Sequence, residues 1–306
     1  MKLSVLRPLR LLFVVALLAI GLVATGCGSD DDDGGSSSSA STTPATTTDT
    51  GGAAAAGAIA VPDEIRSKGT LTVATDPTYA PNEFVERGST RIIGMDVDLI
   101  NAIAEKLGLR ADVQKATFDA IIPGLAARRY DVGISSFTDT REREQTVDFV
   151  TYFSAGTSFY IRRGGPDIAT LEDICGEKVA VEKGTTQATD VQTQNRRCDT
   201  PADLQVYPDQ NGANLAIQSG RADVGMADSP VAAYIVKQSN GAFELDGEPY
   251  GTAPYGIALP KDSGLEQPVL EALRALIEDG TYMEILRRWG VEQGAIDDPV
   301  INGAIN

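Results

Sequence analysis

Short apolar runs alternate with longer amphipathic segments from Thr70 onward, which indicates strands and helices in regular alternation. Residues 71–75 (Leu-Thr-Val-Ala-Thr) predict a strand. Residues 96–107 carry apolar side chains at helical spacing and are followed by Gly108, so they predict a helix that ends there. The next expected elements are a strand, a helix and a strand, at 111–114, 118–129 and 130–134.

A second series with a similar order begins near residue 158. Its expected strands lie at 158–162, 178–181 and 223–226, and its expected helices at 186–197, 211–219 and 229–238. Asp131-Val-Gly in the first series matches Asp223-Val-Gly in the second, and each follows a helix end and a short turn. Because the strand–helix order is repeated, two α/β lobes are favoured over one continuous sheet.

Polar side chains stand where the last strand of each series ends. Ser135, Ser136 and Thr138 follow one strand, and Asp228 follows the other. Open α/β folds place ligands at the carboxyl ends of their strands, so facing lobes would share one cleft. Arg143 lies eight residues after Ser135, and hydroxyls with a guanidinium form a good receptor for a small carboxylate. On this segment alone, a strand end followed by a capped, solvated helix explains the residues equally well.

The turn at 182–187 (Glu-Lys-Gly-Thr-Thr-Gln) offers a second group for an anion. Gly184 permits a tight turn, and the amides that follow would lie at a helix N-terminus. A plain N-cap by either threonine is the alternative, and both interpretations can hold together. The turn lacks the glycine spacing and the lysine of a phosphate loop. With Arg143 for a carboxylate and Asp228 for an ammonium, the crevice matches the two ends of an α-amino acid.

The N-terminal residues 1–26 have the pattern of a signal peptide. Three basic residues precede an uncharged apolar stretch at 11–23 that is short for a membrane span. The following Cys27 comes after Leu-Val-Ala-Thr-Gly, which resembles the lipobox of bacterial lipoproteins, so Cys27 is the expected lipidation site; an ordinary signal peptide with an incidental cysteine is the alternative. The low-complexity residues 27–60 cannot bury a core and predict a disordered tether with a reach of roughly 30 Å.

Charge and composition exclude several classes of function. The chain has a formal charge of −17, and removing the three basic residues of segment 1–26 makes it −20. That charge, without a basic patch, argues against nucleic-acid binding. The chain has no histidine, which excludes zinc sites of the usual kind and Ser-His or Cys-His catalysis; no metal or cofactor is expected.

The cysteines beyond Cys27 are Cys175 and Cys198. In an exported chain they predict one disulfide, with two unpaired buried thiols as the alternative. The loop is 24 residues long, counted inclusively, and closing it would contribute roughly 3 kcal/mol to stability.

Six segments between about residue 69 and residue 291 resemble the family 3 extracellular solute-binding proteins of polar amino-acid ABC importers. They are 73–81 (Val-Ala-Thr-Asp-Pro-Thr-Tyr-Ala-Pro), 94–99 (Gly-Met-Asp-Val-Asp-Leu), 118–125 (Phe-Asp-Ala-Ile-Ile-Pro-Gly-Leu), 135–143, 184–187 (Gly-Thr-Thr-Gln) and 279–282 (Asp-Gly-Thr-Tyr). The chain is particularly similar to histidine-binding and lysine/arginine/ornithine-binding members. The resemblance covers nearly the whole part of the chain that is expected to fold.

The resemblance implies ligand-binding roles for ten residues: Asp76, Tyr79, Phe118, Ser135, Ser136, Thr138, Arg143, Thr186, Gln187 and Asp228. Arg143 would clamp the ligand carboxylate, helped by the Thr138 hydroxyl and the Thr186 amide. Asp228 and Ser136 would receive the α-ammonium group. Tyr79 and Phe118 would flank the ligand side chain, and the remaining three residues would contact or face it. Asn82 departs from the family pattern, which has an aromatic residue there. Asp76 stands where family members that bind basic ligands use a carboxylate, as binders of neutral polar ligands also can, so the resemblance implies a polar or basic amino acid.

The resemblance also implies a two-lobed periplasmic-binding-protein (type II) fold of the α/β class, with the ligand cleft between lobes joined by a two-strand hinge. Lobe 1 would comprise residues 61–155 and 253–298, lobe 2 residues 156–252, and residues 299–306 would form a tail. Closure of such a hinge around a ligand stabilises the closed form through the additional contacts.

The sequence therefore predicts a monomeric, extracytoplasmic protein, lipid-anchored to the cell membrane, that binds an amino acid and delivers it to the permease of an ABC importer. An enzyme is one alternative, because the scaffold also resembles cyclohexadienyl dehydratases and Glu83 or Glu182 would serve as the acid in an elimination. A sensory module that signals through a separate partner is another. Turnover of prephenate or arogenate would favour the enzyme.

Overall fold

The computed structural model describes residues 59–305. The predicted signal peptide, the lipidation site Cys27 and nearly all of the predicted tether lie outside the described residues. Within residues 59–305, no helix combines the length and the apolar character that crossing a membrane requires.

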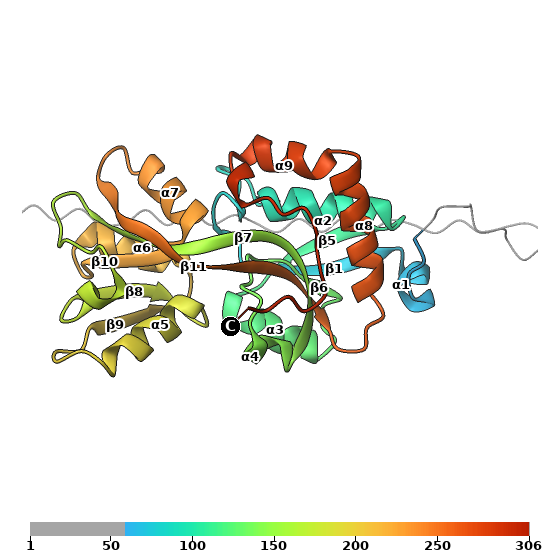
Figure 1. Ribbon diagram of the computed structural model, residues 1–306. Helices are drawn as coiled ribbons and strands as arrows, with labels where there is room; N and C mark the ends of the chain where they lie inside the picture. The colour runs from blue at the N-terminus through green and yellow to red at the C-terminus, as the bar shows by residue number, and fades with distance from the viewer. Residues whose placement is uncertain (1–58, 306) are drawn as a thin grey trace, which may run out of the picture. The chain divides into compact units, whose positions relative to one another are not determined.

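The elements alternate as the hydrophobic pattern predicts (Figure 1). The first part of the chain forms α1 (Asp63–Lys68), β1 (Thr70–Thr75), β2 (Thr78–Tyr79), β3 (Glu83–Val85), β4 (Ile92–Ile93), α2 (Met95–Lys106), β5 (Arg110–Lys115), α3 (Phe118–Ala126), β6 (Val132–Gly133), α4 (Arg141–Glu144) and β7 (Val147–Arg162). The middle part forms the 3-10 helix η1 (Leu171–Ile174), β8 (Lys178–Glu182), α5 (Thr186–Asn195), β9 (Asp203–Tyr207), α6 (Gln210–Ser219), β10 (Val224–Asp228) and α7 (Ser229–Gln238). The last part forms β11 (Phe243–Pro260), α8 (Glu266–Glu278), α9 (Thr281–Trp289) and the 3-10 helix η2 (Glu292–Gly294).

Two long antiparallel strands, β7 with 16 residues and β11 with 18, join the two halves of the fold. The large sheet has the order β5-β1-β6-β11-β7-β10-β8-β9, so β6 pairs with one end of this ribbon and β10 with the other. Figure 1 shows the ribbon running from the side of α2, α8 and α9 to the side of α5, α6 and α7. The prediction of separate sheets was wrong in this respect, because the sequence pattern did not reveal how long these two strands are.

Each half has its own hydrophobic core, which confirms the predicted α/β fold with two lobes. The first core contains buried side chains from 61–155 and from 255–291, so two distant parts of the chain build lobe 1. The second contains side chains from 159–243 together with Tyr79 of lobe 1. Of the predicted tail, residues 299–305 are described and lie partly along β7, where Val150 and Ile301 form an antiparallel bridge. The exact lobe boundaries stay a prediction.

The helix α2 illustrates how local sequence produces the fold of lobe 1. Its buried residues recur every three or four positions and face the core. Gly94 precedes the helix with a φ of 141° and lies against the backbone of Asn82, where a Cβ atom would come within 2.0 Å of the carbonyl oxygen. This close approach lets Asp96 donate its backbone N–H to the same carbonyl at 2.9 Å, which holds the 82–83 segment beside the helix.

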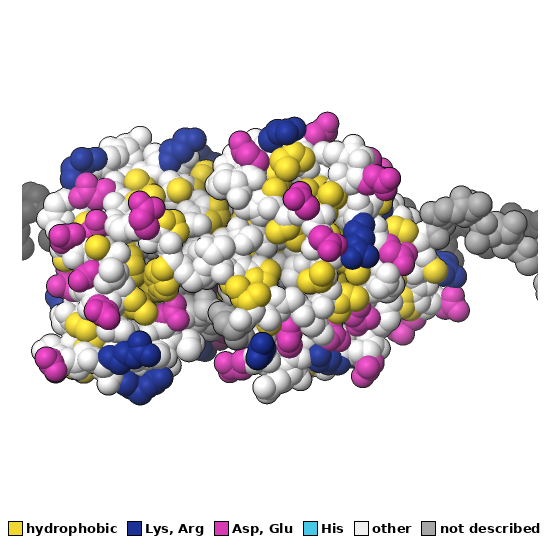
Figure 2. All heavy atoms as spheres, in the orientation of Figure 1, with side chains coloured by type: hydrophobic (Ala, Val, Ile, Leu, Met, Phe, Trp, Pro, Cys, Tyr) yellow, Lys and Arg dark blue, Asp and Glu magenta, His cyan; other side chains and the backbone are white. Residues whose placement is uncertain are grey.

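The surface of the molecule has no continuous basic region on the face in Figure 2, where Lys and Arg side chains are scattered among acidic ones.

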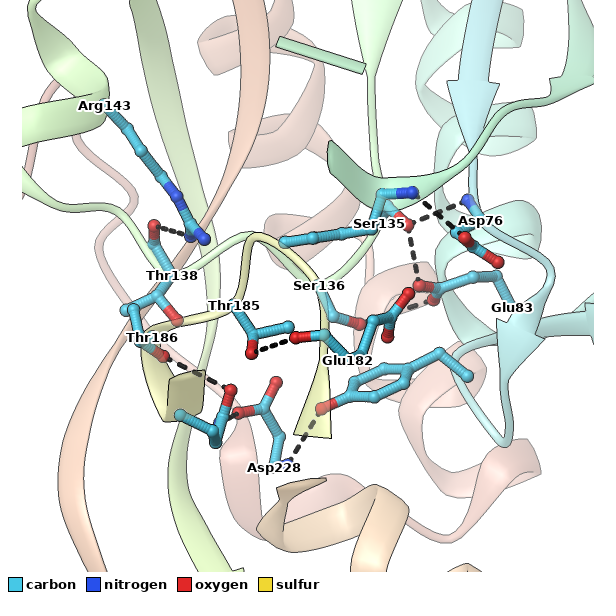
Figure 3. A pocket seen from close by; sticks show the side chains of 13 residues that line it. Asp76, Glu83, Ser135, Ser136, Thr138, Arg143, Glu182, Thr185, Thr186 and Asp228 are labelled. Atoms are coloured by element: carbon cyan, nitrogen blue, oxygen red, sulfur yellow. Dashed lines mark hydrogen bonds between the residues drawn. The ribbon is translucent and has the colours of Figure 1, made fainter. Parts of the chain in front are cut away.

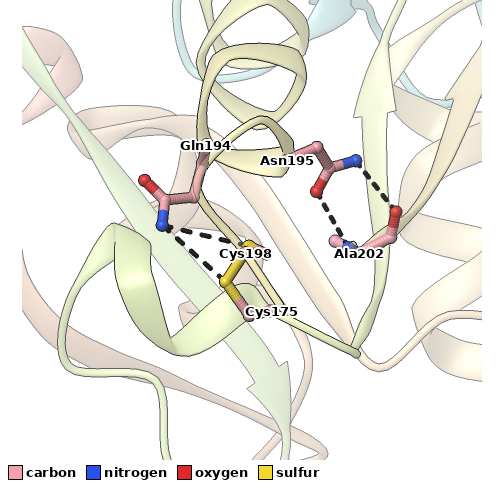
Figure 4. The surroundings of a disulfide bond; sticks show 5 residues. All are labelled: Cys175, Gln194, Asn195, Cys198 and Ala202. Carbon is pink, nitrogen blue, oxygen red and sulfur yellow. Dashed lines mark hydrogen bonds between the residues drawn. A yellow bond between two sulfur atoms is a disulfide. The ribbon is translucent and has the colours of Figure 1, made fainter. Parts of the chain in front are cut away.

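A disulfide joins Cys175 and Cys198 in lobe 2, with 5.6 Å between their Cα atoms (Figure 4). It ties the segment after η1 to the residues that follow α5. Next to it, the Asn195 side chain bonds to both the N–H and the carbonyl of Ala202, at 2.8 and 3.0 Å. The C-terminal end of α5 is therefore fixed covalently and by hydrogen bonds, while the N-terminus of α5 faces the cleft.

Replacing both cysteines (Cys175→Ser with Cys198→Ser) is expected to lower the free energy of unfolding by about 3 kcal/mol, because the unfolded chain gains the entropy of an open loop. Urea unfolding of the oxidised protein and of the double variant measures the difference. Reductant should produce a similar loss in the unaltered protein and no loss in the double variant. Equal stability of the two proteins would contradict the prediction.

Candidate functional site

A pocket between the lobes contains all ten residues that the sequence predicted for ligand binding (Figure 3). About 300 Å³ between its lining side chains is free of protein atoms, a volume that includes solvent open to the pocket. The lining residues are Asp76, Tyr79, Glu83, Phe118, Ser135, Ser136, Thr138, Arg143, Glu182, Thr185, Thr186, Gln187 and Asp228. The other three lining residues are Glu83, Thr185 and Glu182, for which the sequence did not predict ligand binding. The two glutamates were predicted only as acids in the alternative enzyme.

Arg143 is the cationic group of the pocket. Its guanidinium donates to the carbonyl of Thr138 at 2.7 Å and to the carbonyl of Gly184, in lobe 2, at 3.0 Å. It also lies 5.3 Å from the ring centre of Phe118 and 5.5 Å from that of Phe137, a cation–π arrangement. Burial lowers the pKa of Arg143 to about 10, so the group remains charged at neutral pH.

The N-terminus of α5 lies beside Arg143. Thr185 caps the helix, and its hydroxyl accepts the N–H of Ala188 at 3.3 Å. The first turn of a helix leaves N–H groups without partners inside the helix, and its dipole favours an anion there. Thr186 in this turn lines the pocket together with Thr138. This end of the pocket therefore offers a guanidinium, hydroxyls and helix amides to a carboxylate.

Asp228 lies at the end of β10, where two side chains bond to its carboxylate and a third accepts its backbone N–H. Gln187 donates its Nε2 to one oxygen at 2.8 Å, and Tyr255 in β11 donates its hydroxyl to the other at 2.6 Å. The backbone N–H of Asp228 donates to the hydroxyl of Tyr79, from lobe 1, at 2.9 Å. Burial raises the pKa of Asp228, and the bonds from Tyr255 and Gln187 oppose this effect. Gln187 and Tyr255 therefore position the carboxylate of Asp228. No local feature of the sequence had indicated this role for Tyr255.

Ser135 and Ser136 follow β6 as predicted, but their hydroxyls are bonded within lobe 1. Ser135 donates to Glu83 Oε1 at 3.0 Å and accepts the N–H of Asp76 at 2.9 Å. Ser136 has a φ of 53°, donates to Glu83 Oε2 at 3.3 Å and accepts from Asn82 Nδ2 at 2.8 Å. Asn82, which replaces the aromatic residue of the family pattern, is thus buried and supports Ser136 from outside the pocket lining.

Two buried carboxyl groups lie beneath the serines. Asp96 accepts the N–H of Ser136 at 2.9 Å and the hydroxyl of Tyr152 at 2.8 Å. Burial raises the pKa of Asp96 to about 6. Burial, followed by the neighbouring charge of Asp96, raises the pKa of Glu83 well above its ordinary value.

Asp76 and Glu182 extend the acidic side of the pocket across the two lobes. Each is 3% exposed, and Asp76 Oδ1 and Glu182 Oε1 are buried without a hydrogen-bond partner. The other oxygen of Asp76 accepts the N–H of Phe118 at 3.0 Å. Burial raises the pKa of Asp76, and burial with the neighbouring acidic groups raises that of Glu182 to about 9.

The aromatic residues Tyr79 and Phe118 lie on the lobe 1 side of the pocket. Phe118 begins α3 and stacks on Phe137, with ring centres 4.5 Å apart. Tyr79 packs against the core of lobe 2. A salt bridge of 2.8 Å between Lys183 and Asp119 adds another contact between the lobes. The structure is therefore a closed arrangement of the two lobes.

The pocket is chemically two-ended. One end has Arg143 and the α5 amides opposite Asp228, and the other has the carboxyl groups of Asp76, Glu83 and Glu182. Figure 3 shows Arg143 and Asp76 on opposite sides of the view. Within residues 59–305, no group of histidine, cysteine, aspartate and glutamate side chains is arranged to hold a metal ion.

Comparisons with known proteins give the site a context. Residues 71–292 match the family described as bacterial extracellular solute-binding proteins, family 3. The arginine-binding protein ArgT of Corynebacterium glutamicum is 34% identical over 247 residues, which cover 79% of this chain and 81% of that protein. A solved structure of an ancestral arginine-binding protein bound to arginine matches with a TM-score of 0.69 and 36% identity, over 72% of this chain and 98% of that one.

A second solved structure is the ancestral amino acid-binding protein AncCDT-1, described as a precursor of cyclohexadienyl dehydratase. It matches with a TM-score of 0.68 and 33% identity, over 74% of this chain and 98% of that one. Together these matches confirm the resemblance that the six sequence segments predicted.

The raised pKa of Glu182 predicts an unusual pH dependence of stability without ligand. The folded protein holds a proton up to about pH 9, whereas the ordinary pKa is 4.5, so the contribution of this group to the free energy of unfolding falls as pH rises between these values. Glu182→Gln should therefore raise the free energy of unfolding at pH 8 by roughly 2–5 kcal/mol and have little effect at pH 4.5.

Urea unfolding at the two pH values measures this effect. Glu172→Gln, the same substitution at an exposed position of lobe 2, is the matched control. The same pH dependence in Glu182→Gln and in the unaltered protein would show that Glu182 holds no such proton.

Proposed function

The chain belongs to the bacterial extracellular solute-binding proteins, family 3, and on this premise we propose that it captures a polar α-amino acid, most favourably a basic one, between its lobes and delivers it to an ABC importer. The observation that carries the proposal is the two-ended pocket. It has groups for a carboxylate and an ammonium at one end and an excess of carboxyl groups at the other.

The end near Arg143 suits the part that all α-amino acids share. A guanidinium forms parallel hydrogen bonds with a carboxylate, and the amides at the start of α5 add further donors. Asp228 lies within the same pocket, and each of its oxygens can accept a bond in addition to those from Gln187 and Tyr255. The carbonyls of Thr138 and Gly184 hold the guanidinium in place, which reduces the entropy lost when a ligand binds.

The opposite end suits a side chain with a positive charge or several N–H donors. Asp76 Oδ1 and Glu182 Oε1 are buried acceptors without donors, and an unsatisfied buried polar group is costly. A guanidinium, an ammonium or an amide placed between them would supply the missing bonds. The pocket contains four carboxyl groups and one guanidinium, so a cationic side chain improves its charge balance. The arginine-binding relatives agree with this assignment.

Capture would proceed by closure of the two lobes around β7 and β11. Residues from both lobes line the pocket, so a bound ligand gains contacts only in the closed form and favours it. The register of the two strands shifts between Asp246 and Tyr250, between Tyr250 and Ala253, and between Tyr255 and Gly256. These irregular positions are suitable places for bending.

The membrane location is a further part of the proposal. The signal peptide pattern of residues 1–26 and the lipobox before Cys27 support export followed by lipidation. Two or more acyl chains on Cys27 would provide stable anchoring, and residues 28–60 would tether the binding domain near the permease. The protein would act as a monomer there.

An enzyme of the dehydratase type is supported by one observation, the proton that Glu182 keeps at neutral pH in a cleft. A carboxylic acid of this kind can protonate a leaving group. The positioning of Asp228 by three separate groups supports amino-acid capture instead, since an ammonium is the natural partner of that carboxylate. We therefore propose a binding protein without enzymatic activity.

Arg143→Ala is expected to abolish the thermal stabilisation that amino acids produce, because within residues 59–305 no other cation lines the pocket to bind the α-carboxylate. A thermal-shift screen of the twenty amino acids with both proteins tests this. Arg141→Ala, at an exposed position two residues earlier, is the matched control and should keep the shifts. An unaltered shift in Arg143→Ala would remove Arg143 from the site. Turnover of prephenate or arogenate without binding of any amino acid would favour the enzyme.

Cys27→Ser is expected to release the mature protein from the membrane, because it removes the acyl chains that would anchor it. Fractionation of cells that express each version, followed by immunoblotting, measures the distribution. Labelling with a radioactive fatty acid should disappear in the variant. Equal membrane retention of both versions would contradict lipid anchoring through Cys27.

A further inference from the structure

Glu182 is the one carboxyl group that lobe 2 contributes to the acidic end of the pocket. It is the last residue of β8, and its carboxyl group lies on the side of Glu83 and Asp76 in Figure 3. Its backbone carbonyl accepts the hydroxyl of Thr185 at 2.8 Å, which fixes the turn into α5 and therefore the start of the side chain. The proposed binding of the α-carboxylate and α-ammonium makes no use of this residue.

Two observations indicate that Glu182 faces a ligand group. Its side chain is almost fully buried, yet Oε1 has no hydrogen-bond partner, and Asp76 Oδ1 in the opposite lobe is in the same situation. The adjacent Lys183 points away and pairs with Asp119 at 2.8 Å, and Arg143 is held by carbonyls at the other end. A buried carboxyl group without a donor is stabilised by a ligand that supplies one.

We infer that Glu182 determines the side-chain specificity of the pocket by exchanging its own proton for the positive charge of the ligand. This inference rests on the proposed capture of an amino acid. When a guanidinium or ammonium enters, the O–H bond of the Glu182 carboxyl breaks, the proton passes to solvent, and the resulting carboxylate accepts N–H bonds from the ligand. When a neutral amide enters, the carboxyl group keeps its proton and donates it to the amide oxygen. One residue then serves both classes of side chain, with a proton released only for the cation.

The charges around Glu182 explain why it holds a proton in the empty pocket. Burial is the largest cause of its pKa of about 9, and the negative groups that face it are the second. The negative groups lie in four different parts of the fold. They are Asp76 after β1, Asp119 in α3, Asp209 before α6 and Asp228 at the end of β10. Among the other titratable groups near it, Tyr79 and Tyr160 stay neutral because burial raises the pKa of each. Burial also raises the pKa of Glu83, and Lys183 is paired with Asp119. A cationic ligand reverses the balance of charge and makes the ionised form favourable.

Isothermal titration calorimetry with L-arginine and L-glutamine tests the inference. Titrations at pH 7 in buffers of different ionisation enthalpy give the number of protons released on binding. We expect about one proton for L-arginine and none for L-glutamine, and an affinity for L-arginine that rises about tenfold for each pH unit between pH 6 and pH 8. Glu182→Gln should abolish the proton release. It should also lower the affinity for L-arginine at least about tenfold and change the affinity for L-glutamine much less. Glu172→Gln should match the unaltered protein.

The outcomes of these titrations distinguish failure of the inference about Glu182 from failure of the proposed amino-acid capture. Binding of L-arginine without proton release overturns the inference and leaves amino-acid capture intact. The same result follows if only neutral amino acids bind, or if Glu182→Gln releases as many protons as the unaltered protein, because another group then holds the proton. If none of the twenty amino acids binds, the proposed function fails and the inference falls with it.

Discussion

The pairing of β7 with β11 is the constraint on which the rest of the structure depends. The chain crosses between the lobes through these two strands, and each lobe adds its own strands to one end of the ribbon. The ribbon therefore links the two lobes, and strand ends from both lobes meet in the space between them. Ser135 after β6 and Asp228 at the end of β10 reach the pocket for this reason.

The ribbon also takes part in the site. Its residue Tyr255 donates to Asp228, and the loop that carries Thr138 pairs with Tyr255 as an isolated bridge. Bending of the ribbon would therefore move groups at both sides of the pocket. Such coupling between hinge and ligand groups is what lets a bound ligand favour the closed form, since a ligand shifts an equilibrium only through contacts that differ between the two states.

Burial raises the pKa values of the carboxyl groups that line the pocket. Carboxyl groups removed from water keep their protons more readily, and here burial is the largest cause of the raised pKa for Asp76, Glu83, Glu182 and Asp228 alike. Hydrogen bonds then distinguish the four. Asp228 receives two side-chain donors, Glu83 receives the serine hydroxyls, and Glu182 and Asp76 each keep a buried oxygen without a donor. Fixed donors therefore orient Asp228 and Glu83, whereas Asp76 and Glu182 each keep an acceptor that no residue within 59–305 satisfies.

Taken alone, the sequence determined the element order, the repeated strand–helix pattern and the polar strand ends, because hydrophobic periodicity and strand-end chemistry are local properties of the chain. The resemblance of its motifs to the family implied the ten residues that line one pocket. Ligand contact by those residues stays a prediction. Only the tertiary structure decided that β7 and β11 merge both lobes into one sheet, that Asn82 supports Ser136 from outside the pocket, and that Tyr255 positions Asp228. It also decided which carboxyl groups lack a donor. The reason is that strand pairing, burial and hydrogen-bond partners depend on residues far apart in the chain, such as Tyr79 and Asp228, and no local pattern records them.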